Sequence, residues 1–113
     1  MNIQIFGTKK CKETKKAERF FKERKIQFQF VNLQEKELSR GEFKSVMQSV
    51  GGADKMLDTE GKEFEKRNLA YMVYDTEDEI FRNQALLRTP IVRNGKKATI
   101  GNAPDVWKDW LKG

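Results

Sequence analysis

The 113-residue sequence has no histidine and a single cysteine, Cys11. Without histidine, a Cys–His pair, a Ser–His–Asp triad and the usual zinc sites are unavailable, and no metal is expected. One cysteine excludes an intramolecular disulfide and leaves a free thiol, which suits a reducing cytoplasm. No apolar run approaches the roughly 20 residues of a membrane-spanning helix, and no signal-peptide stretch precedes the first strand pattern. These absences predict a cytoplasmic protein that does not enter the membrane.

The charge is basic but evenly distributed. Lys and Arg number 23 against 17 Asp and Glu, which gives a formal net charge of +6. The two signs are interleaved, and neither an arginine-rich tail nor a stacked aromatic motif is visible, so direct nucleic-acid binding is not expected. Two alternatives stay open: a well-solvated basic protein, or one that binds an anionic substrate or an acidic protein surface.

Cys11 lies between a predicted strand and a predicted helix. Residues 2–6 have a strand pattern, and residues 12–24 have an apolar helical stripe. A thiol at a helix start is close to free N–H groups and the positive end of the helix dipole, which lower its pKa. Nearby lysines add positive charge or only form a solvated face: Lys9, Lys10, Lys12, Lys15 and Lys16. Cys11 is therefore a candidate nucleophile, with a buried or vestigial thiol as the alternative.

The middle of the chain predicts a helical insert at about 39–87. Residues 26–31 alternate as a second strand before it. Ser39 with Glu42 forms a capping box, and further helical turns are expected around 53–57 and 61–70. Thr76 with Glu79 forms another possible capping box.

The end of the chain returns to strand patterns. Residues 90–100 read as a hairpin with a type I′ turn at Asn94-Gly95. Pro104 lies in the first turn of a last helix. The buried face of that helix is predicted to comprise Val106, Trp107, Trp110 and Leu111. The order β-α-β, helical insert, β-β-α predicts an α/β domain over residues 1–113, with a four-stranded mixed sheet and helices on both faces. A cysteine after the first strand and Thr-Pro before the third are typical of the thioredoxin-like plan.

Two longer segments, 5–17 and 86–96, together with Gly52-Ala53-Asp54 and Ile100-Gly101, carry a resemblance. The chain resembles the arsenate reductase/Spx (ArsC-like) branch of the thioredoxin superfamily. In arsenate reductases of this type, the cysteine attacks arsenate, glutathione and glutaredoxin resolve the adduct, and arginines bind the oxyanion. One such arginine immediately precedes the proline of the third strand, and that bond is typically cis.

The chain departs from this pattern at the arginines. Thr89 precedes Pro90, and Arg88 lies one residue earlier, where a strand points its side chain to the opposite face. A second family arginine falls at about Gly101-Asn102, where this chain has none, and the central one falls near Asp54-Lys55, where only Lys55 could serve. Lysine does not reproduce the forked geometry with which arginine holds a tetrahedral anion. Arsenate reduction is therefore disfavoured.

The residues still predict a thiol oxidoreductase with Cys11 as nucleophile, a small thiol or oxyanion substrate, a glutathione-like co-substrate and no bound cofactor. Thr14 is either a hydrogen-bond donor to the thiolate or an ordinary helix residue. The expected substrate and thiol site comprises Lys10, Lys12, Thr14, Lys15, Arg88, Thr89 and Pro90. Whether Cys11 turns over as an enzyme stays open.

The resemblance to Spx implies a second role. Spx binds the C-terminal domain of the RNA polymerase α subunit, and Gly52 matches a glycine used at that contact. Its Cys-x-x-Cys switch is absent because residue 14 is Thr. The alternative prediction is thus a non-enzymatic regulator that works without an internal disulfide.

Overall fold

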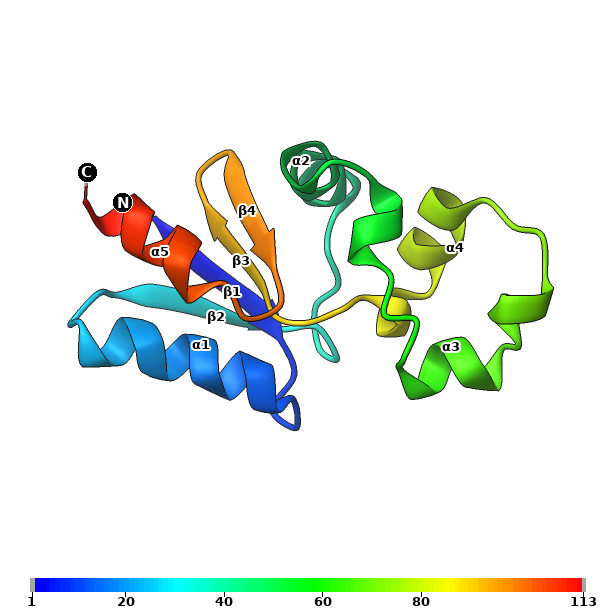
Figure 1. Ribbon diagram of the computed structural model, residues 1–113, viewed down its shortest axis with the longest axis horizontal. Helices are drawn as coiled ribbons and strands as arrows, with labels where there is room; N and C mark the ends of the chain where they lie inside the picture. The colour runs from blue at the N-terminus through cyan, green and yellow to red at the C-terminus, as the bar shows by residue number, and fades with distance from the viewer. Residues whose placement is uncertain (1, 113) are drawn as a thin grey trace.

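The computed structural model describes residues 2–112, and its centre is one mixed sheet with the strand order β2-β1-β3-β4 (Figure 1). β1 (Ile3–Gly7) pairs in parallel with β2 (Phe28–Asn32) and antiparallel with β3 (Ile91–Asn94). β4 (Lys97–Ile100) pairs antiparallel with β3. The predicted four-stranded mixed sheet is confirmed.

Helices α1 (Lys12–Glu23) and α5 (Pro104–Leu111) cover one face of the sheet. Their aromatic side chains pack together with strand residues of that face, as in the edge-to-face pair of Phe20 and Trp107. Pro104 occupies the first turn of α5, as predicted. The prediction for Val106 is wrong, because this side chain is 43% exposed. Trp107 and Trp110, three residues apart, define the buried face of so short a helix and leave Val106 outside it.

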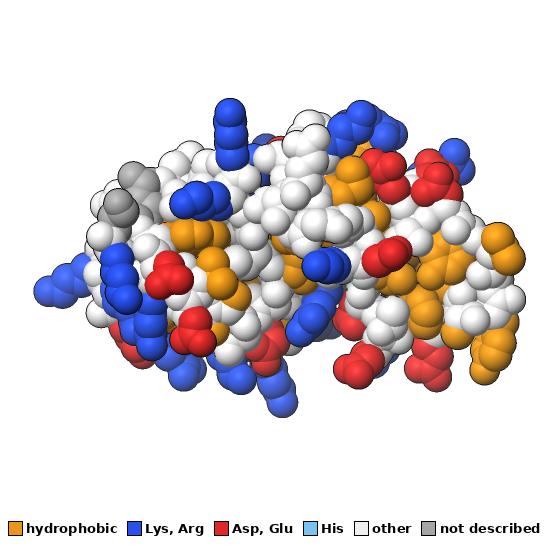
Figure 2. All heavy atoms as spheres, turned by 45° about the horizontal axis from the view of Figure 1, so that its top comes forward, with side chains coloured by type: hydrophobic (Ala, Val, Ile, Leu, Met, Phe, Trp, Pro, Cys, Tyr) orange, Lys and Arg blue, Asp and Glu red, His pale blue; other side chains and the backbone are white. Residues whose placement is uncertain are grey.

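The insert covers the other face with short helices: α2 (Arg40–Val50), η1 (Ala53–Met56), α3 (Lys62–Lys66), η2 (Leu69–Tyr71), α4 (Thr76–Arg82) and η3 (Gln84–Leu86). The buried side chains of Phe43 and Val46 on α2 join Phe6 of the sheet in a second core. Figure 1 shows that α3 and α4 extend beyond the sheet, which elongates the molecule. Figure 2 shows apolar side chains exposed at that far end, where the exposed large hydrophobic residues of the insert are Tyr71, Met72 and Val73.

Two predicted helix starts have different outcomes. The capping box at α2 is confirmed, because Ser39 Oγ accepts from Glu42 N–H and Glu42 Oε1 accepts from Ser39 N–H. The box predicted for α4 is wrong, because Asp75 is the N-cap and its side chain accepts from Asp78 N–H. A carboxylate accepts hydrogen bonds from the free N–H groups and also interacts favourably with the positive end of the helix dipole. Asp75 is therefore favoured over the neighbouring Thr76 as the N-cap.

The β3–β4 hairpin forms as predicted, but its turn type differs. Asn94 pairs with Lys97, so the two loop residues are Gly95 and Lys96 rather than Asn94 and Gly95. Gly95 has a φ of 61°, whereas Lys96 has no positive φ. A positive φ at the first loop residue alone matches a type II′ turn, which requires glycine there.

Within residues 2–112, no helix reaches the length and hydropathy that a membrane crossing requires.

Candidate active site

Cys11 is the N-cap residue of α1, and its thiol is partly exposed. Its backbone is extended, with φ −79° and ψ 118°. The Cys11 N–H donates to Thr8 O at 3.2 Å, and its carbonyl accepts from Lys15 N–H at 3.2 Å. The thiol therefore lies at the end of α1 where free N–H groups point toward it.

Thr89 is brought against the thiol from 78 positions away in the chain. Its Oγ1 lies 3.0 Å from Cys11 Sγ and donates to it, and Sγ lies 3.8 Å from the Thr89 carbonyl oxygen. The Thr89–Pro90 peptide bond is cis, as the family resemblance implied. Pro90 is anchored from the other side, because its carbonyl accepts from Gly101 N–H at 2.8 Å.

Thr14 lies beneath the thiol, one turn into α1, and is fully buried. Its hydroxyl packs against Gly7, where an added Cβ atom would collide with Oγ1. Within residues 2–112 the hydroxyl forms no hydrogen bond of regular geometry, but it contributes to lowering the pKa of Cys11. Gly7, Thr14 and Cys11 therefore form one closely fitted unit at the join of β1 and α1.

Burial raises the pKa of Cys11, but hydrogen bonding outweighs it. The side chains of Thr14 and Thr89 and the backbone N–H groups of Thr14 and Glu13 stabilise the thiolate, so the pKa lies below its ordinary value. The sequence predicted activation of Cys11 by the helix terminus and by cationic side chains, and left open a hydrogen bond from Thr14. The helix terminus does contribute, but the threonine hydroxyls, not the lysines, are the side chains that lower the pKa.

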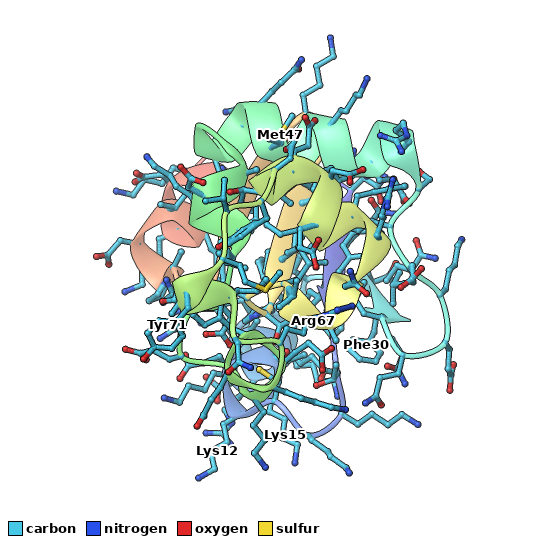
Figure 3. The ribbon with its side chains drawn as sticks, turned by 90° about the vertical axis from the view of Figure 1, so that its right-hand side faces the viewer. Lys12, Lys15, Phe30, Met47, Arg67 and Tyr71 are labelled. Carbon is cyan, nitrogen blue, oxygen red and sulfur yellow. The ribbon has the colours of Figure 1, made fainter. Side chains whose placement is uncertain are left out.

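The lysines named as site residues are exposed to solvent: Lys10, Lys12 and Lys15. In Figure 3, Lys12 and Lys15 point outward from α1 into solvent, away from the insert. Their ammonium groups can attract an anionic ligand at the surface, but they do not line the site around the Cys11 thiol.

Arg88 faces a different part of the molecule from Thr89. Its guanidinium lies over Gly101 and lines a hollow of about 510 Å³ together with Lys55. Within residues 2–112, no hydrogen bond joins Arg88 to Cys11. Thr89 therefore reaches the thiol, whereas Arg88 belongs to the other hollow.

A second hollow, of about 520 Å³, begins at the two threonines beside Cys11, Thr8 and Thr89. Its remaining lining residues are Leu33, Gln34, Glu35, Glu37, Gln84, Ala85 and Leu87. The walls are joined by the buried Gln84, whose Oε1 accepts from Leu38 N–H at 2.7 Å and whose Nε2 donates to Leu38 O at 3.0 Å. Sequence reasoning missed this hollow. One available signal was Gln84, a polar residue directly before the apolar run Ala85-Leu86-Leu87.

Gly52, named for partner binding, ends the turn after α2 and does not line the hollow beside Cys11. It has a φ of 135°, and a Cβ atom added there would meet nothing within 4 Å. Across residues 2–112, no group of three or more Cys, Asp or Glu side chains is placed to hold a metal ion.

The chain matches known proteins over nearly its whole length. The model of the ArsC family matches residues 6–110. A curated relative, the global transcriptional regulator Spx of Streptococcus pyogenes serotype M1, is 28% identical over 96% of this chain and 84% of its own.

Two solved structures show the same fold at lower identity. The putative ArsC family related protein from Bacteroides fragilis is 18% identical, with a TM-score of 0.85 over 96% of this chain and 97% of its own. An arsenate reductase from Vibrio cholerae is 19% identical, with a TM-score of 0.81 over 96% and 97%. These likenesses confirm the predicted thioredoxin-like fold.

Proposed function

Because this chain belongs to the ArsC family, we propose that it is a monothiol oxidoreductase with Cys11 as the nucleophile. The observation that carries the proposal is the hydrogen bond of 3.0 Å from Thr89 Oγ1 to Cys11 Sγ, at the N-terminus of α1. A thiolate stabilised in this way is populated at lower pH, and the thiolate is the reactive form. A free thiol is maintained in a reducing cytoplasm, where we propose that the protein acts.

The reaction has two exchange steps. The Cys11 thiolate attacks one sulfur of a disulfide, so that the sulfur–sulfur bond breaks and the other half leaves as a thiolate. Cys11 is thereby oxidised to a mixed disulfide. A second thiolate, of a glutathione-like donor or of a glutaredoxin, then attacks this mixed disulfide and releases Cys11 as a thiolate. No second cysteine in the chain is required, which fits a sequence with only one.

The proposal does not extend to arsenate. Thr89 occupies the position before the proline, and the Arg88 guanidinium lies over Gly101. A threonine hydroxyl beside the sulfur donates one neutral hydrogen bond, whereas a forked arginine supplies paired charged bonds to an oxyanion.

Incubation with oxidised glutathione, followed by mass spectrometry of the intact protein, tests the proposal. We expect a glutathione adduct on Cys11, its removal by free glutathione, and no adduct on Cys11→Ser. If the wild-type protein forms no adduct and its thiol titrates near the unperturbed value of about 8.5, the proposal is wrong.

A second candidate function is favoured by the relatives and by one surface position. The Streptococcus pyogenes relatives are named global transcriptional regulators, and Gly52 presents an open backbone with nothing above it. An arginine at this position would project into any partner docked there. The second proposal is therefore that the chain binds the C-terminal domain of the RNA polymerase α subunit through the Gly52 region.

Titration calorimetry with that isolated domain separates the two functions. Gly52→Arg is expected to abolish binding, while Cys11→Ser retains it. Gly95→Arg is the matched control, since Gly95 also has a positive φ and nothing within 4 Å of its Cβ position. Absence of wild-type binding, or equal binding by both arginine variants, contradicts the second proposal.

A further inference from the structure

We infer that the hollow beside Cys11 receives the part of a small disulfide that carries a protonated amine, so that the protein prefers aminothiol disulfides to anionic ones. This inference rests on the proposed exchange function of Cys11 and names the substrate class of that site. Its basis is the position of the hollow next to the sulfur and the charges of its lining.

Two residues that contact Cys11 line the hollow. Thr89 both donates to Cys11 Sγ and lines the hollow, and Thr8, whose carbonyl accepts from Cys11 N–H, lines it too. The fully buried hydroxyl of Thr14, which does not line the hollow, also lowers the pKa of this thiol. A group bonded to Sγ therefore extends from the sulfur over the threonines into this space.

The walls of the hollow are fixed by buried contacts. Leu33 continues the sheet pairing of β2, because its N–H donates to Gly7 O at 2.9 Å. The far side of the 33–38 segment is held by the two hydrogen bonds between Gln84 and Leu38. Leu33 and Leu87 are buried, so the hollow has an apolar floor for methylene groups.

The lining has charges of one sign. Glu35 and Glu37 are its charged residues, and neither forms an ion pair within residues 2–112. No lysine or arginine lines it, although Lys9 and Lys10 lie exposed on the turn before Cys11. The cationic residues Arg88 and Lys55 line the other hollow instead. A ligand in the hollow beside the thiol thus meets an apolar floor and two acidic residues, with no cationic residue in the lining.

The chemistry that complements this lining is a short aliphatic thiol with an ammonium group. The ammonium group is attracted by the negative charges of Glu35 and Glu37, whereas a carboxylate of glutathione is repelled by them. Exchange with an aminothiol disulfide follows the same balanced steps: the thiolate attacks, the sulfur–sulfur bond breaks, and one aminothiolate leaves and is protonated. For partly screened charges at such a surface, we expect removal of both carboxylates to change the rate ratio about fivefold.

The test compares three disulfides: cystamine, which is dicationic, 2-hydroxyethyl disulfide, which is neutral, and oxidised glutathione, which is anionic. Rates of adduct formation on Cys11 are measured by mass spectrometry at low salt, and each is divided by the rate for the neutral disulfide. In Glu35→Gln/Glu37→Gln, the ratio of cystamine to glutathione disulfide is expected to fall about fivefold and to lose its salt dependence.

The matched control is Glu23→Gln/Glu60→Gln, which removes the same charge from two exposed residues outside the hollow. Normalising to the neutral disulfide cancels any general effect of charge on the reactivity of Cys11, including that of Lys9 and Lys10. An unchanged ratio in Glu35→Gln/Glu37→Gln, or an equal fall in the control, overturns the inference while the exchange function stands. Failure of all three disulfides to form an adduct with the wild-type protein overturns the exchange function itself.

Discussion

Replacement of Thr89 by valine isolates the hydrogen bond on which the reactivity of Cys11 is proposed to depend. Valine keeps the shape of the side chain but removes the Oγ1 donor that lies 3.0 Å from Sγ. Hydrogen bonds to charged groups contribute about 1.5–3 kcal/mol, and the partial exposure of this thiol reduces that to about 1 kcal/mol. Because the bond stabilises the thiolate more than the thiol, its loss raises the pKa of Cys11. At a pH below the pKa, about 1 kcal/mol lowers the thiolate fraction roughly fivefold.

The assay is the rate of alkylation by iodoacetamide as a function of pH, with the ultraviolet absorbance of the thiolate as a second reading. Thr89→Ser is the control, since it retains the hydroxyl and is expected to titrate close to the wild-type protein. At a pH above the pKa of both proteins the wild-type and valine rates converge, because each is then fully ionised. If Thr89→Val and Thr89→Ser titrate alike, or if alkylation of the valine variant is as fast as wild type near neutral pH, the assignment of the pKa to this bond is refuted.

Two further predictions concern stability. Gly7→Ala is expected to lower the free energy of unfolding by about 1–3 kcal/mol, because the added Cβ atom meets Thr14 Oγ1. Gly41→Ala, which has open space in α2, is expected to raise it by up to about 1 kcal/mol. Urea denaturation of both variants checks this, and equal midpoints would contradict it. Since the pKa of Cys11 is lower in the folded chain than the roughly 8.5 of an unfolded one, the wild-type protein should gain stability over Cys11→Ser as pH rises toward about 8.5 and lose that gain as pH falls through the folded value. A stability difference that is constant with pH would count against the lowered pKa.

The sheet and its two helical layers follow from patterns that the sequence displays locally. The alternation in residues 26–31 and the helical stripe of residues 12–24 each reflect burial of one face, and the structure confirms both elements. The errors fall at positions where neighbouring residues compete for the same role. Asp75 displaced Thr76 as a cap, and the hairpin register moved Gly95 to the first loop position. The spacing of residue types in the sequence does not determine which of two neighbouring residues becomes the cap or enters the turn.

The candidate site was predictable only in part. The placement of Cys11 at a helix start could be inferred from the adjoining strand and helix patterns. The bond to Thr89 spans 78 positions and depends on how residues 88–90 pass the start of α1. The hollow depends on Gln84 clamping Leu38 across 46 positions. Both contacts join residues far apart in the chain, and no local pattern in the sequence specifies them.

The side chains of residues 88 and 89 contact different parts of the molecule, and this decides which group lies beside the thiol. Thr89 faces the sulfur, so the group closest to the thiolate is a neutral donor rather than a cation. The Arg88 guanidinium lies over Gly101 and lines the other hollow, as Lys55 does. A disulfide needs no cation at the attacked sulfur, whereas a tetrahedral oxyanion does. Because Arg88 lines the other hollow, Glu35 and Glu37 are the charged residues of the hollow beside Cys11, which is the charge pattern that the proposed exchange with a cationic disulfide requires.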